Sequence, residues 1–316
     1  MRMFLTLLAT LITHVAVGQH SLDSLTNDST VIAFVNHYGK QASPPWRGWW
    51  FDVKRLEGLT KPEWVFLKEF YGTKYLLADL SGDGKKDLVA NGNPTGWHGT
   101  RILVFLTTPN GIELARLGAH SAGLGEHISL YNDGGEMCLV LGHLSYTIGN
   151  QSPPAEKIIM DTLRYRFGGF VNYKPAKVPS PAFDTLSFKV ASSWSSYPRY
   201  ALSVTKDGKL TLLKERLVID YAKETSHMDT ITIEKRLSPE TMDTLQQIIR
   251  WSGYCNLPQG FETPHLSDVE TAVTRVVFED GISWQINDYG SEGTYELRLL
   301  YDRMWRWLFE AFKLKY

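Results

Sequence analysis

Cysteine is scarce in this sequence of 316 residues, which contains only Cys138 and Cys255. Two thiols exclude a small fold held together by a disulfide framework, and a chain of this length can bury a core without one. Cys138 lies in an apolar run typical of a strand. We expect both residues to be buried free thiols rather than metal ligands.

An excess of charge of either sign is also absent, because the formal net charge is -1. No basic field indicates nucleic acid, and no acidic block indicates a solvating tail. Beyond the N-terminal segment, no apolar run reaches the roughly 18 residues that a membrane-spanning helix needs. We therefore expect no nucleic-acid partner and no transmembrane segment.

The N-terminal segment has the pattern of a secretory signal peptide over residues 1–18. Arg2 supplies a positive charge, the stretch from Phe4 to Val17 is mainly apolar, and Ala16-Val17-Gly18 places small residues at the cleavage position. The mature chain is then expected to begin at Gln19. This pattern predicts a periplasmic or secreted protein.

The remaining sequence predicts an α+β protein of two domains. Strand-like runs joined by Asn-Gly, Asp-Gly and Gly-Gly turns dominate the first half, and two helices with apolar stripes appear in the second. Three prolines between Lys174 and Pro181 indicate a linker. The expected divisions are a disordered stretch at 19–29, a mainly antiparallel β domain at 30–174, a linker at 175–184, and an antiparallel sheet covered by two helices at 185–316.

One segment carries a specific chemical pattern, a calcium loop between two expected strands. Oxygen donors alternate along it: the side chains of Asp79, Ser81, Asp83 and Asp87 and the carbonyl of Lys85. Calcium prefers six to eight oxygen ligands, and three neighbouring carboxylates would repel each other without a counter-charge. We expect calcium here in a structural role. The alternative is a metal-free Asp-Gly hairpin whose counter-charge comes from lysines.

The loop resembles the calcium loops of the FG-GAP and VCBS repeat family, whose pattern is Asp-x-Asn/Asp-x-Asp-Gly-x-x-Asp followed by an apolar pair, here Leu88-Val89. The resemblance implies that Asp79, Asp83, Asp87 and the Lys85 carbonyl are ligands. Ser81 departs from the usual Asn or Asp. Only one copy is found, so the family's propeller is not implied. An EF-hand is excluded, because Ala90 stands where its bidentate acid would be.

The second half, from residue 185, resembles a bacterial domain family of unknown function. The matching stretch is Ser193-Trp194-Ser195-Ser196-Tyr197-Pro198-Arg199-Tyr200, where that family has Cys-x-x-x-Cys-Pro-x-Tyr. Ser193 and Tyr197 replace the two cysteines, so no disulfide or thiol function carries over. The resemblance implies no activity.

A secreted serine hydrolase is a second functional hypothesis. Ala119-His120-Ser121-Ala122-Gly123 is similar to the nucleophile elbow of some lipases, with Ser121 as nucleophile and His143 and Asp133 as conceivable partners. An elbow requires a strand before it and a helix after it, and the residues that follow favour another strand. A glycine-rich loop is the plainer interpretation. The histidines lack the spacing of a zinc site.

Aromatic residues are abundant, and four of them offer a binding surface: Trp46, Trp49, Trp50 and Trp97. Exposed together they would form a platform for a carbohydrate or a protein, and buried together they would pack a domain edge. The sequence as a whole favours an exported, non-catalytic binding or interaction protein over an enzyme. A structural component of the cell envelope is a third hypothesis.

Overall fold

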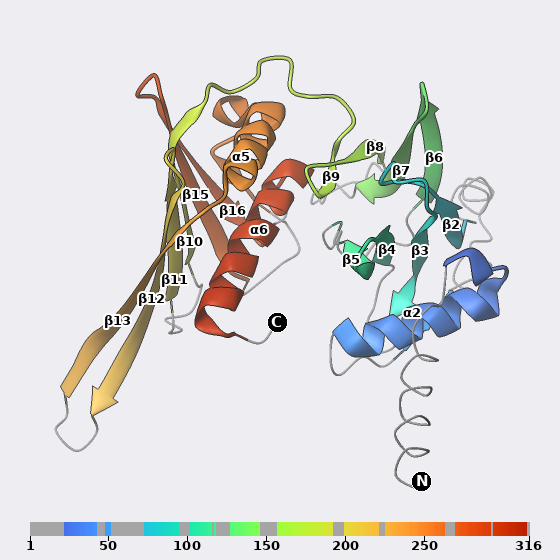
Figure 1. Ribbon diagram of the computed structural model, residues 1–316, viewed down its shortest axis with the longest axis horizontal. Coiled ribbons are helices and arrows are strands. Elements are labelled where there is room, and N and C mark those ends of the chain that lie inside the picture. The colour runs from blue at the N-terminus through green and yellow to red at the C-terminus, as the bar shows by residue number, and fades with distance from the viewer. Residues whose placement is uncertain are drawn as a thin grey trace, which may run out of the picture. The chain divides into compact units, whose positions relative to one another are not determined.

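The computed structural model shows an α+β protein (Figure 1), as the sequence predicts. Strands outnumber helices, and the sheets are built almost wholly from antiparallel pairs. The structure describes residues 22–42, 48–51, 73–94, 101–115, 117, 127–145, 157–191, 199–220, 225–262, 269–291 and 293–314.

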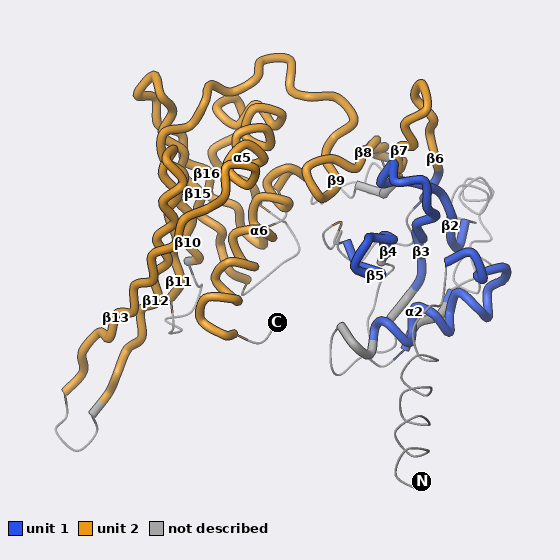
Figure 2. Tube along the Cα trace, viewed as in Figure 1, with its two compact units in different colours: residues 1–115, 124–129 blue, residues 116–123, 130–316 orange. Residues whose placement is uncertain are grey.

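Contacts divide the chain into two compact units (Figure 2). The first comprises residues 1–115 and 124–129, and the second comprises 116–123 and 130–316. Residues 130–174 thus group with the C-terminal residues, whereas the sequence places a boundary near residue 175. The boundaries expected from the sequence stay a prediction.

The first unit contains one sheet with the order β1-β3-β4-β5, in which β2 also pairs with β3. Its elements are η1 (Leu22–Ser24), α2 (Asp28–Ala42), β1 (Trp49–Trp50), β2 (Tyr75–Ala78), β3 (Asp87–Pro94), β4 (Arg101–Thr108) and β5 (Gly111–Ala115). Phe34 of α2 packs edge-on against Phe105 of β4, with ring centroids 5.2 Å apart. Leu22 and Leu25 are buried in the same core. The disorder expected over 19–29 therefore does not extend to these two residues.

A second sheet has the order β6-β7-β8-β9. Its strands are β6 (His127–Asp133), β7 (Glu136–Ser145), β8 (Lys157–Arg166) and β9 (Gly169–Asn172). Tight glycine turns join β6 to β7 and β8 to β9, where Gly134, Gly135 and Gly168 adopt the positive φ angles that glycine accepts without strain. Both hairpins are as the sequence predicts.

The third sheet has the order β13-β12-β11-β10-β15-β16-β14, in which only the β14–β16 pair is parallel. Its strands are β10 (Phe183–Ala191), β11 (Arg199–Thr205), β12 (Lys209–Asp220), β13 (Thr225–Arg236), β14 (Gly260–Phe261), β15 (Thr271–Phe278) and β16 (Ser283–Tyr289). β12 and β13 run on beyond their neighbours as a projecting hairpin (Figure 1).

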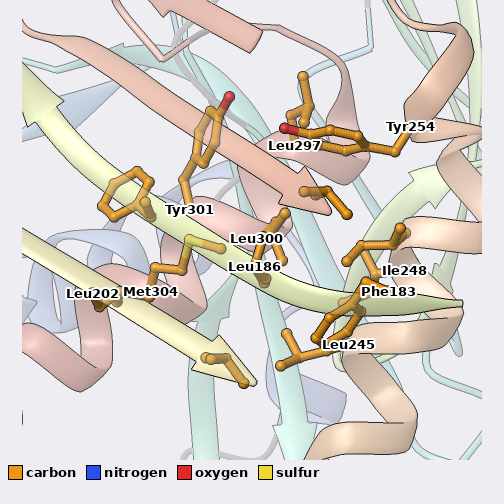
Figure 3. Packing of buried hydrophobic residues seen from close by; sticks show 14 of the residues in the cluster. Phe183, Leu186, Leu202, Leu245, Ile248, Tyr254, Leu297, Leu300, Tyr301 and Met304 are labelled. Atoms are coloured by element: carbon orange, nitrogen blue, oxygen red, sulfur yellow. The ribbon is translucent and has the colours of Figure 1, made fainter. Parts of the chain in front are cut away.

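Two helices, α5 (Pro239–Ser252) and α6 (Tyr295–Phe312), cover this sheet, and the short η3 (Tyr254–Asn256) follows α5. Their apolar stripes meet the sheet in a buried core (Figure 3). Leu245 and Ile248 of α5 and Met304 of α6 are at most 1% exposed. A sheet covered by two helices is what the sequence predicts for this region.

Both ends of helix α5 are determined by residues that lie next to them in the sequence. The Ser238 side chain accepts from the Thr241 N–H at 3.2 Å, which satisfies one of the helix's unpaired first-turn donors. Gly253 ends the helix in the left-handed conformation at φ 59°. A β-carbon there would lie 2.8 Å from the Val178 carbonyl oxygen. Part of the proline-rich stretch therefore packs directly on the end of α5.

Within the part of the chain described above, no helix has the length and apolar character that crossing a membrane requires.

Candidate functional site

The acidic loop begins directly after β2, and its first aspartate organises its backbone. Asp79 Oδ1 accepts hydrogen bonds from the N–H groups of Gly82 at 2.7 Å and Asp83 at 3.1 Å, and Oδ2 accepts from Gly84 at 2.8 Å. Gly82 and Gly84 adopt φ angles of 77° and 83°, which turn these amides toward the carboxylate. The loop is therefore wrapped around Asp79.

Asp87, the last residue of the loop and the first of β3, is fully buried. Its Oδ2 accepts from the N–H groups of Leu80 at 2.8 Å and Ser81 at 3.0 Å, and Oδ1 accepts from Thr107 of β4 at 2.8 Å. Burial raises the pKa of the Asp87 carboxyl, and the three backbone donors oppose that effect. Asp87 thus ties both ends of the loop to the neighbouring strand.

The remaining predicted ligands lie in the middle of the loop. Asp83 is exposed, and its Oδ1 accepts from the Lys85 N–H at 2.9 Å. The Ser81 hydroxyl oxygen is buried and has no hydrogen-bond partner among the described residues. This oxygen stands at the third position of the calcium pattern. Its lone pairs are available to coordinate a cation.

The loop fits a calcium ion only in part. Asp79 and Asp83 can still offer lone pairs, since each carboxylate has about four acceptor sites. Asp87, however, uses both oxygens inside the fold. Among the described residues, no group of three or more His, Cys, Asp or Glu side chains is arranged to hold a metal ion. The structure presents a loop closed by its own amides, and calcium binding stays a prediction.

The serine hydrolase hypothesis falls largely outside the described residues. Ser121 and His120 lie there, as does the side chain of His143. Asp133 is described, at the end of β6, and its carboxylate accepts a hydrogen bond from Tyr173 and lies 3.6 Å from the Arg164 guanidinium. Of the three residues proposed for the hydrolase, only the side chain of Asp133 is described. The hydrolase therefore stays a prediction.

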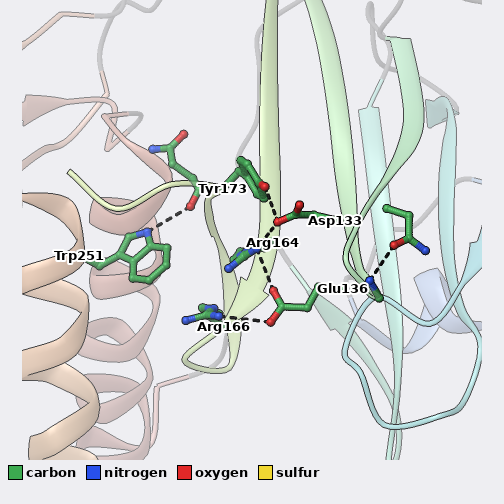
Figure 4. Close-up of polar contacts among 9 residues, drawn as sticks. Asp133, Glu136, Arg164, Arg166, Tyr173 and Trp251 are labelled. Atoms are coloured by element: carbon green, nitrogen blue, oxygen red, sulfur yellow. Dashed lines mark hydrogen bonds and ion pairs between the residues drawn. The ribbon is translucent and has the colours of Figure 1, made fainter. Parts of the chain in front are cut away.

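Asp133 belongs to a polar group that the sequence did not predict, which we call the Arg164 cluster: Asp133, Glu136, Arg164, Arg166 and Tyr173 (Figure 4). The Arg164 guanidinium lies 2.9 Å from the Glu136 carboxylate and 4.8 Å from the centroid of the Tyr173 ring. The hydrogen bond to Asp133 raises the pKa of Tyr173 to about 12.

The Arg164 cluster joins the second sheet to helix α5. Arg166 lies over the Trp251 ring at 5.0 Å, and the Trp251 indole N–H donates to the Asn172 carbonyl at 3.1 Å (Figure 4). The charges are thus paired with each other and stacked on aromatic rings. These contacts are structural, because they fasten the second sheet to helix α5. Sequence reasoning missed the cluster because its members come from separate strands.

Both cysteines are free thiols, as expected. Cys138 is buried in β7, and burial raises the pKa of its thiol. Cys255 is half-buried, and its N–H donates to the Ser180 hydroxyl at 3.0 Å. The raised pKa means that the Cys138 thiol is not activated as a nucleophile would need to be.

The aromatic platform cannot be placed. Trp46 and Trp97 lie outside the described residues, and the structure describes only the backbone of Trp49 and Trp50, which form β1. An aromatic binding surface for a carbohydrate or a protein stays a prediction.

Strand β13 of the projecting hairpin is the most exposed strand of the described chain, and we call β12 and β13 together the arm. Every residue of β13 except Ile233 is exposed. Three apolar side chains of the arm are between 43% and 47% exposed: Ile219, Met228 and Ile231. Among the described residues, β11 pairs with β12 as far as Glu215, and beyond that residue β12 pairs only with β13, as a ribbon of two described strands.

No family model, curated protein or solved structure matches this chain. The two resemblances drawn from short motifs therefore stay predictions.

Proposed function

We propose that this chain is an exported, non-catalytic interaction protein that contacts its partner through the arm. The export part rests on the signal-peptide pattern of residues 1–18. The interaction part rests on one observation, the projecting ribbon with exposed apolar side chains and an outer edge that no described strand pairs with. An isolated two-stranded ribbon is at best marginally stable in water, so a contact that covers it would stabilise it.

The position of the arm's apolar residues supports this proposal. Leu217 stands opposite Met228 in the ladder, and Val218 stands opposite His227, so that neighbouring pairs present apolar groups to opposite faces of the ribbon. A strand whose only role was to extend the hydrophobic core would bury one face and expose polar side chains on the other. Apolar groups on both faces, and an edge without a partner among the described strands, are features of a surface that receives another chain.

Site-specific photo-crosslinking in the cells that produce the protein tests this proposal. A photo-reactive amino acid at Met228 is expected to give a covalent adduct of defined mass. The control position is Ile282, which is 54% exposed at the turn before β16 and lies outside the arm. An adduct at Met228 and none at Ile282 is the expected result. Equal yields, or no adduct from the arm, would contradict the proposal.

A structural calcium ion at the acidic loop is a separate part of the proposal, supported by the donor pattern and the unpartnered Ser81 hydroxyl. An ion that binds only the folded chain raises its stability, so added calcium is expected to raise the melting temperature by a few degrees in calorimetry. Asp83→Ala should abolish that rise.

Asp280→Ala is the matched control, because Asp280 also accepts a backbone N–H within an Asp-Gly turn, from Ile282 at 3.0 Å. This variant should keep the full response to calcium. An unchanged melting temperature in the unmodified chain would remove calcium from the proposal and leave the interaction function untouched.

A further inference from the structure

We infer that the partner of the arm is a second copy of this chain, which pairs with it strand to strand along β13. This inference rests on the proposed function, because it names the partner of the same surface. β13 is an edge strand of its sheet, and a row of backbone donors and acceptors along such an edge can pair with another strand.

The direction of the backbone groups determines which residues face the open edge. The N–H of Leu237 donates to the carbonyl of Gly208 at 2.9 Å, in continuation of the β12–β13 register. Hydrogen-bonded and non-hydrogen-bonded pairs alternate in an antiparallel ladder. The odd-numbered residues of β13 therefore bond to β12. The even-numbered residues present their N–H and C=O groups outward: Ser226, Met228, Thr230, Thr232, Glu234 and Arg236.

Two copies that pair through these outward groups are related by a two-fold axis. An axis at Thr232 places Thr232 opposite the partner's Thr232 and Ile231 opposite the partner's Ile233. Asp229 then stands opposite the partner's Lys235, and the symmetry repeats each contact. Opposite charges and apolar side chains that face each other across two strands stabilise the pair.

Neighbouring registers lack this match. An axis at Ile231 sets Asp229 opposite an isoleucine and His227 opposite Lys235. An axis at Ile233 sets Ile231 opposite Lys235. The charge pattern of β13 is thus self-complementary about Thr232.

The side chains concerned share one face of the ribbon. Ile231 and Ile233 are opposite Lys214 and Leu212 of β12, and Leu212 is fully buried on the side of the sheet that the helices cover. Pairing about Thr232 would cover Ile231, which is 46% exposed in the single chain. Four isoleucines would form one apolar cluster with an ion pair at each end, and the two sheets would become continuous.

Sedimentation equilibrium of the full mature chain tests the inference with a charge exchange. The unmodified chain is expected to form dimers in a concentration-dependent manner. Asp229→Lys and Lys235→Asp each place like charges opposite each other twice per dimer, and each should weaken dimerisation by about tenfold or more. The double variant restores opposite charges and should dimerise like the unmodified chain. Circular dichroism of each variant establishes that the monomer is folded.

A second variant tests the edge itself. Thr232→Pro removes an N–H that faces outward, so the β12 ladder keeps its hydrogen bonds while the dimer loses two at its axis. This variant is expected to be a folded monomer.

A chain that stays monomeric at all concentrations, or a double variant as weak as the single ones, would overturn the inference. A monomer whose arm is still crosslinked to a different protein in cells would leave the proposed function intact. A monomer without any arm adduct would contradict both.

Discussion

Replacing Asp87 with alanine is expected to lower the free energy of unfolding by about 3–5 kcal/mol, since three backbone N–H groups lose their acceptor. Asp87 is fully buried and accepts from Leu80, Ser81 and Thr107 at 2.8 to 3.0 Å. The variant leaves these three donors without their acceptor at a buried position. Urea denaturation of the two proteins measures the difference.

Asp83→Ala is the control for this effect. Asp83 is exposed and accepts one hydrogen bond within the same loop, so its removal should cost less than about 1 kcal/mol in the absence of calcium. Equal losses in the two variants would mean that Asp87 does not anchor the loop to the neighbouring strand.

The Asp87 carboxyl also predicts a pH dependence. Its pKa is raised in the folded chain above the ordinary value of 3.8. At a pH between these two pKa values, the folded state therefore holds a proton that the unfolded state has released. The free energy of unfolding should therefore fall as the pH rises from about 3.8 through the raised pKa. Asp87→Asn has no such titration. The stability difference between the unmodified chain and this variant, measured against pH, should show the slope, and a constant difference would contradict it.

Replacing Glu296 with alanine is expected to cost about 2–4 kcal/mol and to loosen the second sheet from helix α6. Glu296 lies in the first turn of α6, is 3% exposed, and accepts from the N–H of Asn172 at 2.8 Å and from its side-chain amide at 3.0 Å. The variant leaves two donors of Asn172 without an acceptor and removes a negative charge from a helix N-terminus.

Hydrogen exchange locates this effect. The amides of β9 should exchange faster in Glu296→Ala, because β9 is held against α6 by this contact. Glu310→Ala on the same helix removes an exposed glutamate and should change the free energy of unfolding by no more than about 0.5 kcal/mol. Unchanged protection of β9 in Glu296→Ala would contradict the claim that the Glu296–Asn172 contact holds β9 against α6.

Local signals predicted much of the fold. Helix α5 follows from Ser238, the proline after it, the apolar stripe and Gly253, which are all close in sequence. The hairpins at Gly134 and Gly168 follow from turns that only glycine adopts readily. These elements were predictable because each is determined by neighbouring residues.

β13 was not predicted, for a physical reason. A strand is recognised by the alternation of a buried and an exposed face, and β13 buries neither face. Its β-branched run around Thr232 was the only signal. The partners of Arg164 were missed for a different reason, since Asp133 and Tyr173 meet only when separate strands pair. For the acidic loop, the sequence indicated the aspartates but not that Asp87 would turn inward.

Shortening the arm tests the central claim most directly. Lys214 and Ile231 stand opposite each other in the ladder, so an Asn-Gly turn can join them in place of residues 215–230. The buried residues of β12 stay in the shortened chain, and its melting temperature should change by only a few degrees. Both chains are extracted gently from producing cells and their sedimentation is compared. We predict that the complete chain sediments as part of a larger assembly and the shortened chain as a monomer, whereas identical sedimentation would contradict the claim that the arm is the interaction surface.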